Sequence, residues 1–167
     1  VPVEYLSKTI DLLSKIGHIP ETVEERYQDY IHAMHCYDPN GWDVDLHWQA
    51  FFFHSKKSVS FQSNQANRQK ISLSENIQTE IFNDSLQLFH TIIHGILDGK
   101  GSLRWVVDAA IIMRHKKESI NFPDLITFAK QTNNSVVFRH GICFLANFID
   151  FKELQLEIII KVFTKLF

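Results

Sequence analysis

The second half of the chain repeats apolar residues at helical spacing, and this pattern limits the folds that are open to it. From Asn83 onward, apolar side chains recur every three or four residues, so that they line one face of successive helices. Asn83 can cap the first of these helices, and Pro123 lies near the first turn of a later one. The pattern predicts about five helices, of which the last two cover about 135–148 and 151–166.

The first part of the chain combines one helix with a segment of strict alternation. Apolar residues at helical spacing predict a helix over roughly 3–16, and Gly17 is typical of the position after a helix end. Residues 26–37 favour a strand, and residues 38–41 read Asp-Pro-Asn-Gly, which is a turn signal. Residues 42–48 then alternate between apolar and polar side chains.

This alternation indicates a β-hairpin with two different faces. We expect one face to be buried and the other to carry carboxylates. The buried face would hold Trp42, Val44, Leu46 and Trp48, and the opposite face Asp43, Asp45 and His47. A single hairpin is not a stable sheet, so we expect its partner strands to precede Val1.

Together these patterns predict an α+β fold that is mostly helical, with an N-terminal helix and a β-hairpin followed by a bundle of about five helices. Residues 1–54 would be the C-terminal part of an α/β core, residues 55–82 a polar, irregular excursion, and residues 83–167 a helical domain. The chain begins at Val1 without a methionine and ends at Phe167 inside an apolar run. We therefore expect it to be trimmed from a longer protein.

Charge and cysteine content argue against several classes of protein. The formal net charge is −2 and the pI is about 6.5, so the chain has no basic field that would attract nucleic acid. Cys36 and Cys143 lie far apart without a CxxC spacing, which argues against a disulfide scaffold and a cysteine zinc site. No apolar run approaches the ~18 residues of a membrane span. We expect a cytoplasmic protein.

The segment from Asp43 to His47 is the sharpest candidate for chemistry. Asp43, Asp45 and His47 alternate with apolar residues, so a strand would present them on one face, within reach of one divalent cation. Carboxylates suit Mg²⁺ or Mn²⁺, which serve phosphoryl transfer by bridging substrate oxygens. The spacing alone favours the simpler alternative, a solvated outer face of an edge strand.

Two pairs of polar residues in the helical part are further candidates. His90 and His94 share one helix face and could share a metal, but the zinc-protease pattern HExxH is absent, which favours hydrogen-bonded histidines. Arg104 and Asp108 are also four apart, so a salt bridge between them is the favoured interpretation. Arg104 could instead contact a phosphate, because it follows the glycine-containing segment 99–102.

Three segments of the chain resemble one known family. Residues 44–48 read VDLHW, residues 86–95 read LQLFHTIIHG, and residues 103–110 read LRWVVDAA. In order and approximate separation they are similar to segments of the uncharacterised nucleotidyltransferase family, which belongs to the polymerase-β-type nucleotidyltransferase superfamily. The resemblance continues weakly through residues 122–150.

The resemblance implies a metal-dependent enzyme that transfers a nucleoside monophosphate from an NTP to an acceptor that the sequence does not identify. In the superfamily a small mixed sheet carries a Gly-Ser loop and three carboxylates that bind Mg²⁺ or Mn²⁺. Only Asp45 matches one of these carboxylates, the third, whereas Asp43 is a candidate metal ligand from its spacing alone. The Gly-Ser loop and the first two acids would precede Val1, so this chain alone is expected to be inactive. The resemblance also suggests that the helical region packs near the nucleotide cleft, without assigning chemistry to its residues. We therefore name His90, His94, Arg104 and Asp108, and His47 of the strand face, only as possible substrate contacts.

Two alternatives remain open from the sequence. The chain could be a non-catalytic helical binding domain with a degenerate nucleotide cleft. A ribonuclease of the HEPN type also fits a helix-rich chain, but it expects an arginine several residues before a histidine on one helix. Arg114-His115 and Arg139-His140 are adjacent instead.

Overall fold

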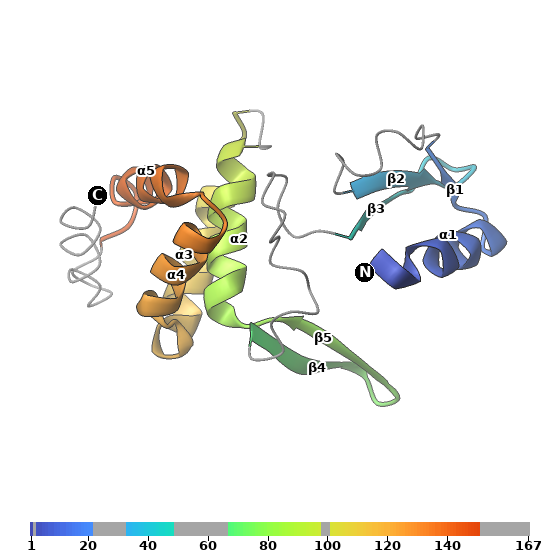
Figure 1. Ribbon diagram of the computed structural model, residues 1–167, viewed down its shortest axis with the longest axis horizontal. Coiled ribbons are helices and arrows are strands. Elements are labelled where there is room, and N and C mark those ends of the chain that lie inside the picture. Colours follow the sequence, from blue (N-terminus) through green and yellow to red (C-terminus); the bar gives the residue numbers. More distant parts are fainter. Residues whose placement is uncertain (2, 22–32, 49–66, 98–100, 151–167) are drawn as a thin grey trace. The chain divides into compact units, whose positions relative to one another are not determined.

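The computed structural model describes residues 1, 3–21, 33–48, 67–97 and 101–150 of the 167-residue chain (Figure 1). The chain forms two compact units, Val1–Gln65 and Ala66–Phe167. Helices and two small antiparallel sheets are present, so the predicted α+β class is confirmed. No helix among the described residues is long and apolar enough to cross a membrane.

The first unit begins with a helix that ends at a glycine, as predicted. A short 3₁₀ turn, η1 (Val3–Tyr5), leads into α1 (Leu6–Lys15). Gly17 has a φ of 94°, and its N–H donates to Ser14 O at 3.1 Å while His18 N–H donates to Leu13 O at 2.9 Å. These two bonds form a Schellman motif, which turns the chain out of the helix and toward the sheet.

The sheet of the first unit has three antiparallel strands in the order β1-β2-β3, with bounds Ile19–Pro20, Ala33–Tyr37 and Asp43–His47. The β2–β3 pairing runs from Tyr37 opposite Asp43 to Ala33 opposite His47. One face of the sheet packs on α1 through a small core of Met34, Cys36, Leu46 and Trp48, against which Leu6, Ile10, Leu13 and Val44 also pack. The predicted helix and hairpin therefore share one core, while residues 26–32 of the predicted strand lie outside the described residues.

Trp42 was predicted on the buried face of the hairpin, and this prediction is wrong. Its side chain is 74% exposed. Trp42 belongs to the turn, because its N–H donates to Asp38 Oδ1 at 2.7 Å and its carbonyl accepts from Asp38 N–H at 3.0 Å. The strand pairing begins one residue later, at Asp43, so the alternation of burial does not reach Trp42.

The second unit opens with a β-hairpin where the polar composition predicted an irregular segment. Strand β4 (Arg68–Ser74) pairs with β5 (Ile77–Phe82), with an irregularity between Ser72 and Ser74. Both strands are largely exposed, since Leu73 and Ile77 retain more than half of their surface. Polar, solvent-facing strands resemble a loop in composition, which is why the prediction fails over residues 68–82. Residues 55–66 of that predicted segment lie outside the described residues.

Four α-helices follow the hairpin in the described part of the chain: α2 (Asp84–Leu97), α3 (Arg104–Lys116), α4 (Phe122–Gln131) and α5 (Ser135–Leu145), with a 3₁₀ turn η4 (Lys117–Ser119) after α3. Asn83 caps α2 as predicted, because its Oδ1 accepts the N–H of Leu86 at 2.9 Å. The remaining predicted helix, 151–166, lies outside the described residues.

Helix α2 is the centre of this unit, and α3, α4 and α5 all pack against it (Figure 1). Phe89 of α2 is fully buried, with its ring 4.9 Å from that of Phe138 and 6.1 Å from that of Phe128. Two glycines allow the helices to approach closely. A Cβ atom on Gly95 would lie 2.2 Å from Trp105 Cγ, and one on Gly141 would lie 2.3 Å from Ile92 Cγ2.

Candidate functional site

Strand β3 presents Asp43, Asp45 and His47 on the face opposite the core, as the alternation predicted. Val44 and Leu46 point to the core side, Leu46 being buried. The side chains of Asp43 and Asp45 remain 40% and 47% exposed. The two carboxylates are therefore accessible to solvent and to a ligand.

Each carboxylate on this face has an imidazole as a hydrogen-bond partner. Asp45 Oδ2 lies 2.8 Å from His47 Nε2, two residues along the same strand. Asp43 Oδ2 lies 2.8 Å from His35 Nδ1, which comes from β2. The hydrogen bond to Asp43 raises the pKa of His35, and the nearby charges of Asp43, Asp45 and Glu21 add to that effect. The β3 face is thus made of two Asp–His pairs.

His35 is a member of this face that was not predicted from the sequence. The available signal was the hairpin register: a turn over 38–41 with residues 37 and 43 paired places His35 opposite Asp45. The ring of His35 also stacks on Tyr37, with centroids 5.8 Å apart and planes inclined by 16°. Stacking and hydrogen bonding together hold this imidazole beside Asp43.

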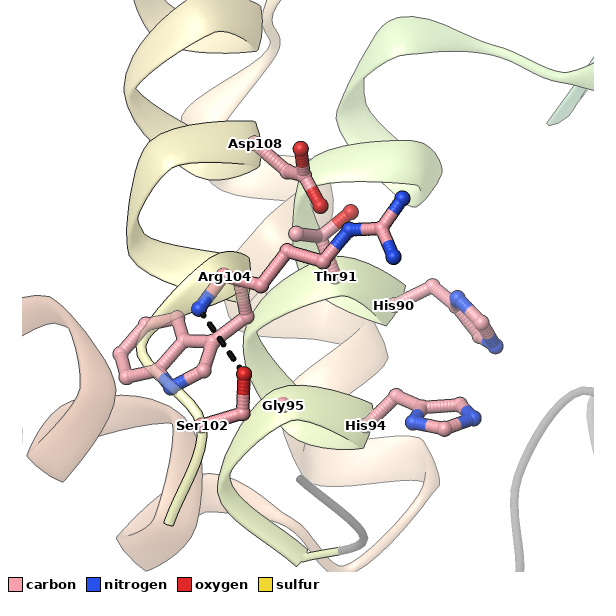
Figure 2. Close-up of a pocket in the computed structure, with 8 residues that line it drawn as sticks. His90, Thr91, His94, Gly95, Ser102, Arg104 and Asp108 are labelled. Carbon is pink, nitrogen blue, oxygen red and sulfur yellow. Dashed lines mark hydrogen bonds between the residues drawn. The ribbon is translucent and has the colours of Figure 1, made fainter. Parts of the chain in front are cut away.

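The second candidate site is a pocket of about 260 Å³ between α2 and α3 (Figure 2). The structure brings four of the predicted substrate contacts to this one place: His90, His94, Arg104 and Asp108. Their spacing in the sequence did not predict that they meet. The pocket is completed by Thr91, Gly95, Ser102 and Trp105.

Side chains from the two helices meet in this pocket. His90 and His94 project to the same side of α2, and their rings lie edge to face with centroids 5.4 Å apart (Figure 2). Arg104 extends from the first turn of α3 across α2, so that its guanidinium lies on the side of His90 (Figure 2). The N–H of Arg104, the first residue of α3, donates to Ser102 Oγ at 3.3 Å.

The predicted salt bridge between Arg104 and Asp108 does not form in the described part of the chain. Both side chains are exposed and both line the pocket, one helical turn apart on α3. The spacing of four residues allows such a pair but does not require it, because exposed ion pairs gain little energy in water. The guanidinium and the carboxylate therefore remain available to a ligand.

The model of the uncharacterised nucleotidyltransferase family matches residues 1–150. The chain belongs to this family. The matched residues include β3, the hairpin β4–β5 and helices α2 to α5, hence both candidate sites. No curated protein and no solved structure matches the chain.

Membership of a nucleotidyltransferase family raises the question of whether the β3 face can hold a divalent metal ion. Its donor chemistry is suitable, because Mg²⁺ and Mn²⁺ prefer carboxylate oxygens. Asp45 uses Oδ2 for His47, and Oδ1 accepts no hydrogen bond from the described residues. However, no three His, Cys, Asp or Glu side chains among the described residues are grouped as a metal centre requires. The face fits one carboxylate position of a metal site, not a complete one.

Proposed function

We propose that this chain is part of a nucleotidyltransferase that transfers a nucleoside monophosphate from an NTP to an acceptor, and that Asp45 is one of its metal-binding carboxylates. The observation that supports this most directly is the position of Asp45. It lies on an exposed strand face, within residues 1–150 that match the nucleotidyltransferase family. Asp43, with its own imidazole partner, is the second candidate ligand on the same face.

The Asp45–His47 pair suits the role of a metal ligand. A metal-binding carboxylate works best when a neighbouring group fixes its orientation, and mutation of such a neighbour commonly lowers metal affinity 10–100-fold. His47 is that neighbour, because its Nε2 lies 2.8 Å from Oδ2, while Oδ1 has no hydrogen-bond partner among the described residues. The Mg²⁺ or Mn²⁺ would neutralise charge on the phosphates of the NTP. His47 is a positioning residue in this scheme.

The number of carboxylates at the β3 face limits what this chain can do. Phosphoryl transfer with two metal ions requires several carboxylates that converge on the cations. Asp43 and Asp45 are the two carboxylates of the β3 face, and they bind imidazoles at separate points. Because the described residues supply too few carboxylates at this face, we expect the 167-residue chain to transfer no nucleotide by itself.

The test compares two Asp→Asn variants in the full 167-residue chain. Mn²⁺ binding is measured by electron paramagnetic resonance, with and without ATP, for the wild type, Asp45→Asn and Asp11→Asn. Asp11 is an exposed aspartate on α1, away from β3, so it is the matched control. We expect Asp45→Asn to weaken Mn²⁺ binding by roughly tenfold or more, and Asp11→Asn to leave it unchanged. Equal Mn²⁺ binding by all three proteins would exclude Asp45 as a ligand.

One alternative function has an observation in its favour. Both carboxylates of the β3 face are occupied by imidazoles, which is also what a non-catalytic binding domain with a degenerate nucleotide cleft would show. In that case ATP would bind equally well with Mn²⁺ and with EDTA. Release of pyrophosphate from ATP by the purified chain would contradict both the alternative and the expected inactivity of the chain.

A further inference from the structure

We propose that the pocket between α2 and α3 binds a small ligand that carries one phosphate group next to a hydroxyl group, such as a phosphorylated sugar. This inference rests on the proposed function, because it names the chemical class of the acceptor. The pocket residues that would bind the ligand are His90, His94, Ser102, Arg104 and Asp108.

Arg104 is the group that would bind the anion. It has no carboxylate partner within 4 Å in the described part of the chain, although Asp108 lies one turn away on the same helix. A guanidinium binds phosphate through two parallel N–H···O bonds, and this geometry is the main reason arginine is common in phosphate sites. Arg104 therefore supplies a charged donor that is available to a phosphate.

Further polar side chains line the same pocket. His90 and His94 approach from α2 on the side to which the guanidinium extends (Figure 2). An imidazole N–H donates to an oxyanion whether the ring is neutral or charged. The hydroxyl of Ser102 adds a donor from the segment before α3. A phosphate bound by Arg104 in this pocket could therefore also accept hydrogen bonds from side chains of α2.

The size and the charge of the pocket determine its selectivity. Its volume of about 260 Å³ is enough to seat a phosphate group and the part of the ligand next to it. Asp108 places a negative charge in the same pocket; its carboxylate disfavours a triphosphate and can accept a hydrogen bond from a hydroxyl group. The charge of the pocket therefore favours a phosphomonoester with an adjacent hydroxyl over a complete NTP.

Close packing holds together the two helices that line the pocket. The close approach of Gly95 to Trp105 fixes the distance between α2 and α3. The ring of Trp105 packs in turn on Phe144 of α5, with centroids 5.7 Å apart. Binding groups carried by packed helices are held more accurately than groups on loops. The helix backbones that carry the binding groups are therefore held in place by packing contacts that do not involve the ligand.

The test uses ribose 5-phosphate as the probe and the full 167-residue chain as the protein, without metal or NTP. Binding is measured by calorimetry and by ¹H–¹⁵N spectra of the Trp105 indole. Ribose, inorganic phosphate and ATP are titrated separately. We expect ribose 5-phosphate to bind more tightly than each of the other three, because it alone combines one phosphate with nearby hydroxyls at a size that fits.

Variants assign the interaction to the pocket. Arg104→Gln should weaken ribose 5-phosphate binding at least roughly tenfold, whereas Arg114→Gln, near the exposed end of the same helix, should leave it unchanged. Asp108→Asn should weaken ribose 5-phosphate but not inorganic phosphate. If Arg104→Gln does not fold, Arg104→Lys keeps the charge without the two-pronged geometry and should show an intermediate loss.

Three results would overturn the inference: no binding of ribose 5-phosphate, binding that Arg104→Gln leaves unchanged, or tighter binding of ATP than of ribose 5-phosphate. The Mn²⁺ experiment on Asp45 is independent of this one. If Asp45→Asn binds Mn²⁺ as well as the wild type while ribose 5-phosphate still binds, the proposed nucleotidyl transfer is contradicted. The pocket then remains a phosphate site.

Discussion

The two candidate sites differ in whether their charged side chains are paired. On the β3 face, each carboxylate is hydrogen-bonded to an imidazole at 2.8 Å. In the α2–α3 pocket, Arg104 and Asp108 lie one helical turn apart and form no salt bridge among the described residues. A paired group has its orientation fixed in advance, whereas an unpaired group leaves its full bonding capacity for a ligand. The first site thus positions its groups, and the second leaves its charges available to a ligand.

The two sites also differ in the hydrophobic core that supports them. Among the described residues, the β3 face lies on a three-stranded sheet whose core contains four buried side chains. The pocket lies on α2, which is packed by three other helices around Phe89. We therefore expect the geometry of the pocket to depend on the helical core, and the geometry of the β3 face to depend on its own hydrogen bonds.

The largest expected effect comes from removing the centre of the helical core. Phe89→Ala should lower the free energy of unfolding by about 3–5 kcal/mol, because it leaves a cavity among fully buried rings. Urea unfolding followed by circular dichroism measures the loss. Val136→Ala on α5 is the control, since that side chain is 79% exposed and its removal should change the free energy by less than about 0.5 kcal/mol. Similar losses for both variants would contradict the assignment of the core.

A smaller effect is expected where α2 contacts α3, at Gly95 and Trp105. Gly95→Ala should destabilise the protein by about 1–3 kcal/mol, since its Cβ would overlap the Trp105 ring and force the helices apart. Thermal unfolding measures this change. Adding Trp105→Leu should recover part of the loss, so that the double variant is more stable than the two single losses predict. Strict additivity would show that the indole is not the obstacle.

The start of α2 provides a third test. Asn83→Ala should cost about 1 kcal/mol, because the N–H of Leu86 loses its cap acceptor. Asn83→Asp keeps an acceptor oxygen and should retain most of the stability. Urea titration of the three proteins distinguishes these outcomes. An alanine variant as stable as the wild type would mean that water replaces the cap without cost.

The smallest effect concerns the Asp–His pairs of the β3 face. The pKa of His35 should lie above the ordinary histidine value of about 6.5, and Asp43→Asn should return it toward that value. The pair stabilises the fold fully below pH ~6.5, and this contribution disappears as the pH rises through the raised pKa of His35. Titration of the imidazole resonances by NMR measures both values. An unchanged His35 pKa in Asp43→Asn would mean that the hydrogen bond is not its cause.

The helical part of the fold could be predicted from the sequence because its apolar residues are both periodic and buried. The spacing around Phe89 and the Asn83 cap indicated α2, and strict alternation indicated β3. The β4–β5 hairpin was missed because its alternation, visible at Ile77, Thr79 and Ile81, lies among polar residues and buries little. Alternation is a weak signal when neither face of a ribbon joins a core.

The candidate sites could be predicted only in part. Spacing along a single strand identified Asp43, Asp45 and His47, and spacing along single helices identified the pairs in α2 and α3. The meeting of those pairs in one pocket depends on how α2 packs against α3, which the spacing within each helix does not determine. His35 was missed because its bond to Asp43 joins two neighbouring strands, β2 and β3, and spacing along one strand does not show such a contact.

The two free thiols have a practical consequence for following the molecule in solution. Cys36 of β2 is fully buried in the core between the sheet and α1, and its burial, with a smaller effect of Asp43, raises the pKa of the thiol. Cys143 is exposed on α5. A thiol reagent should thus react at once with one unit, and with the other only when its sheet transiently opens. The rate of the slow reaction, at Cys36, then reports how often the sheet opens. The fast reaction, at Cys143, gives the rate for an accessible thiol in the same sample.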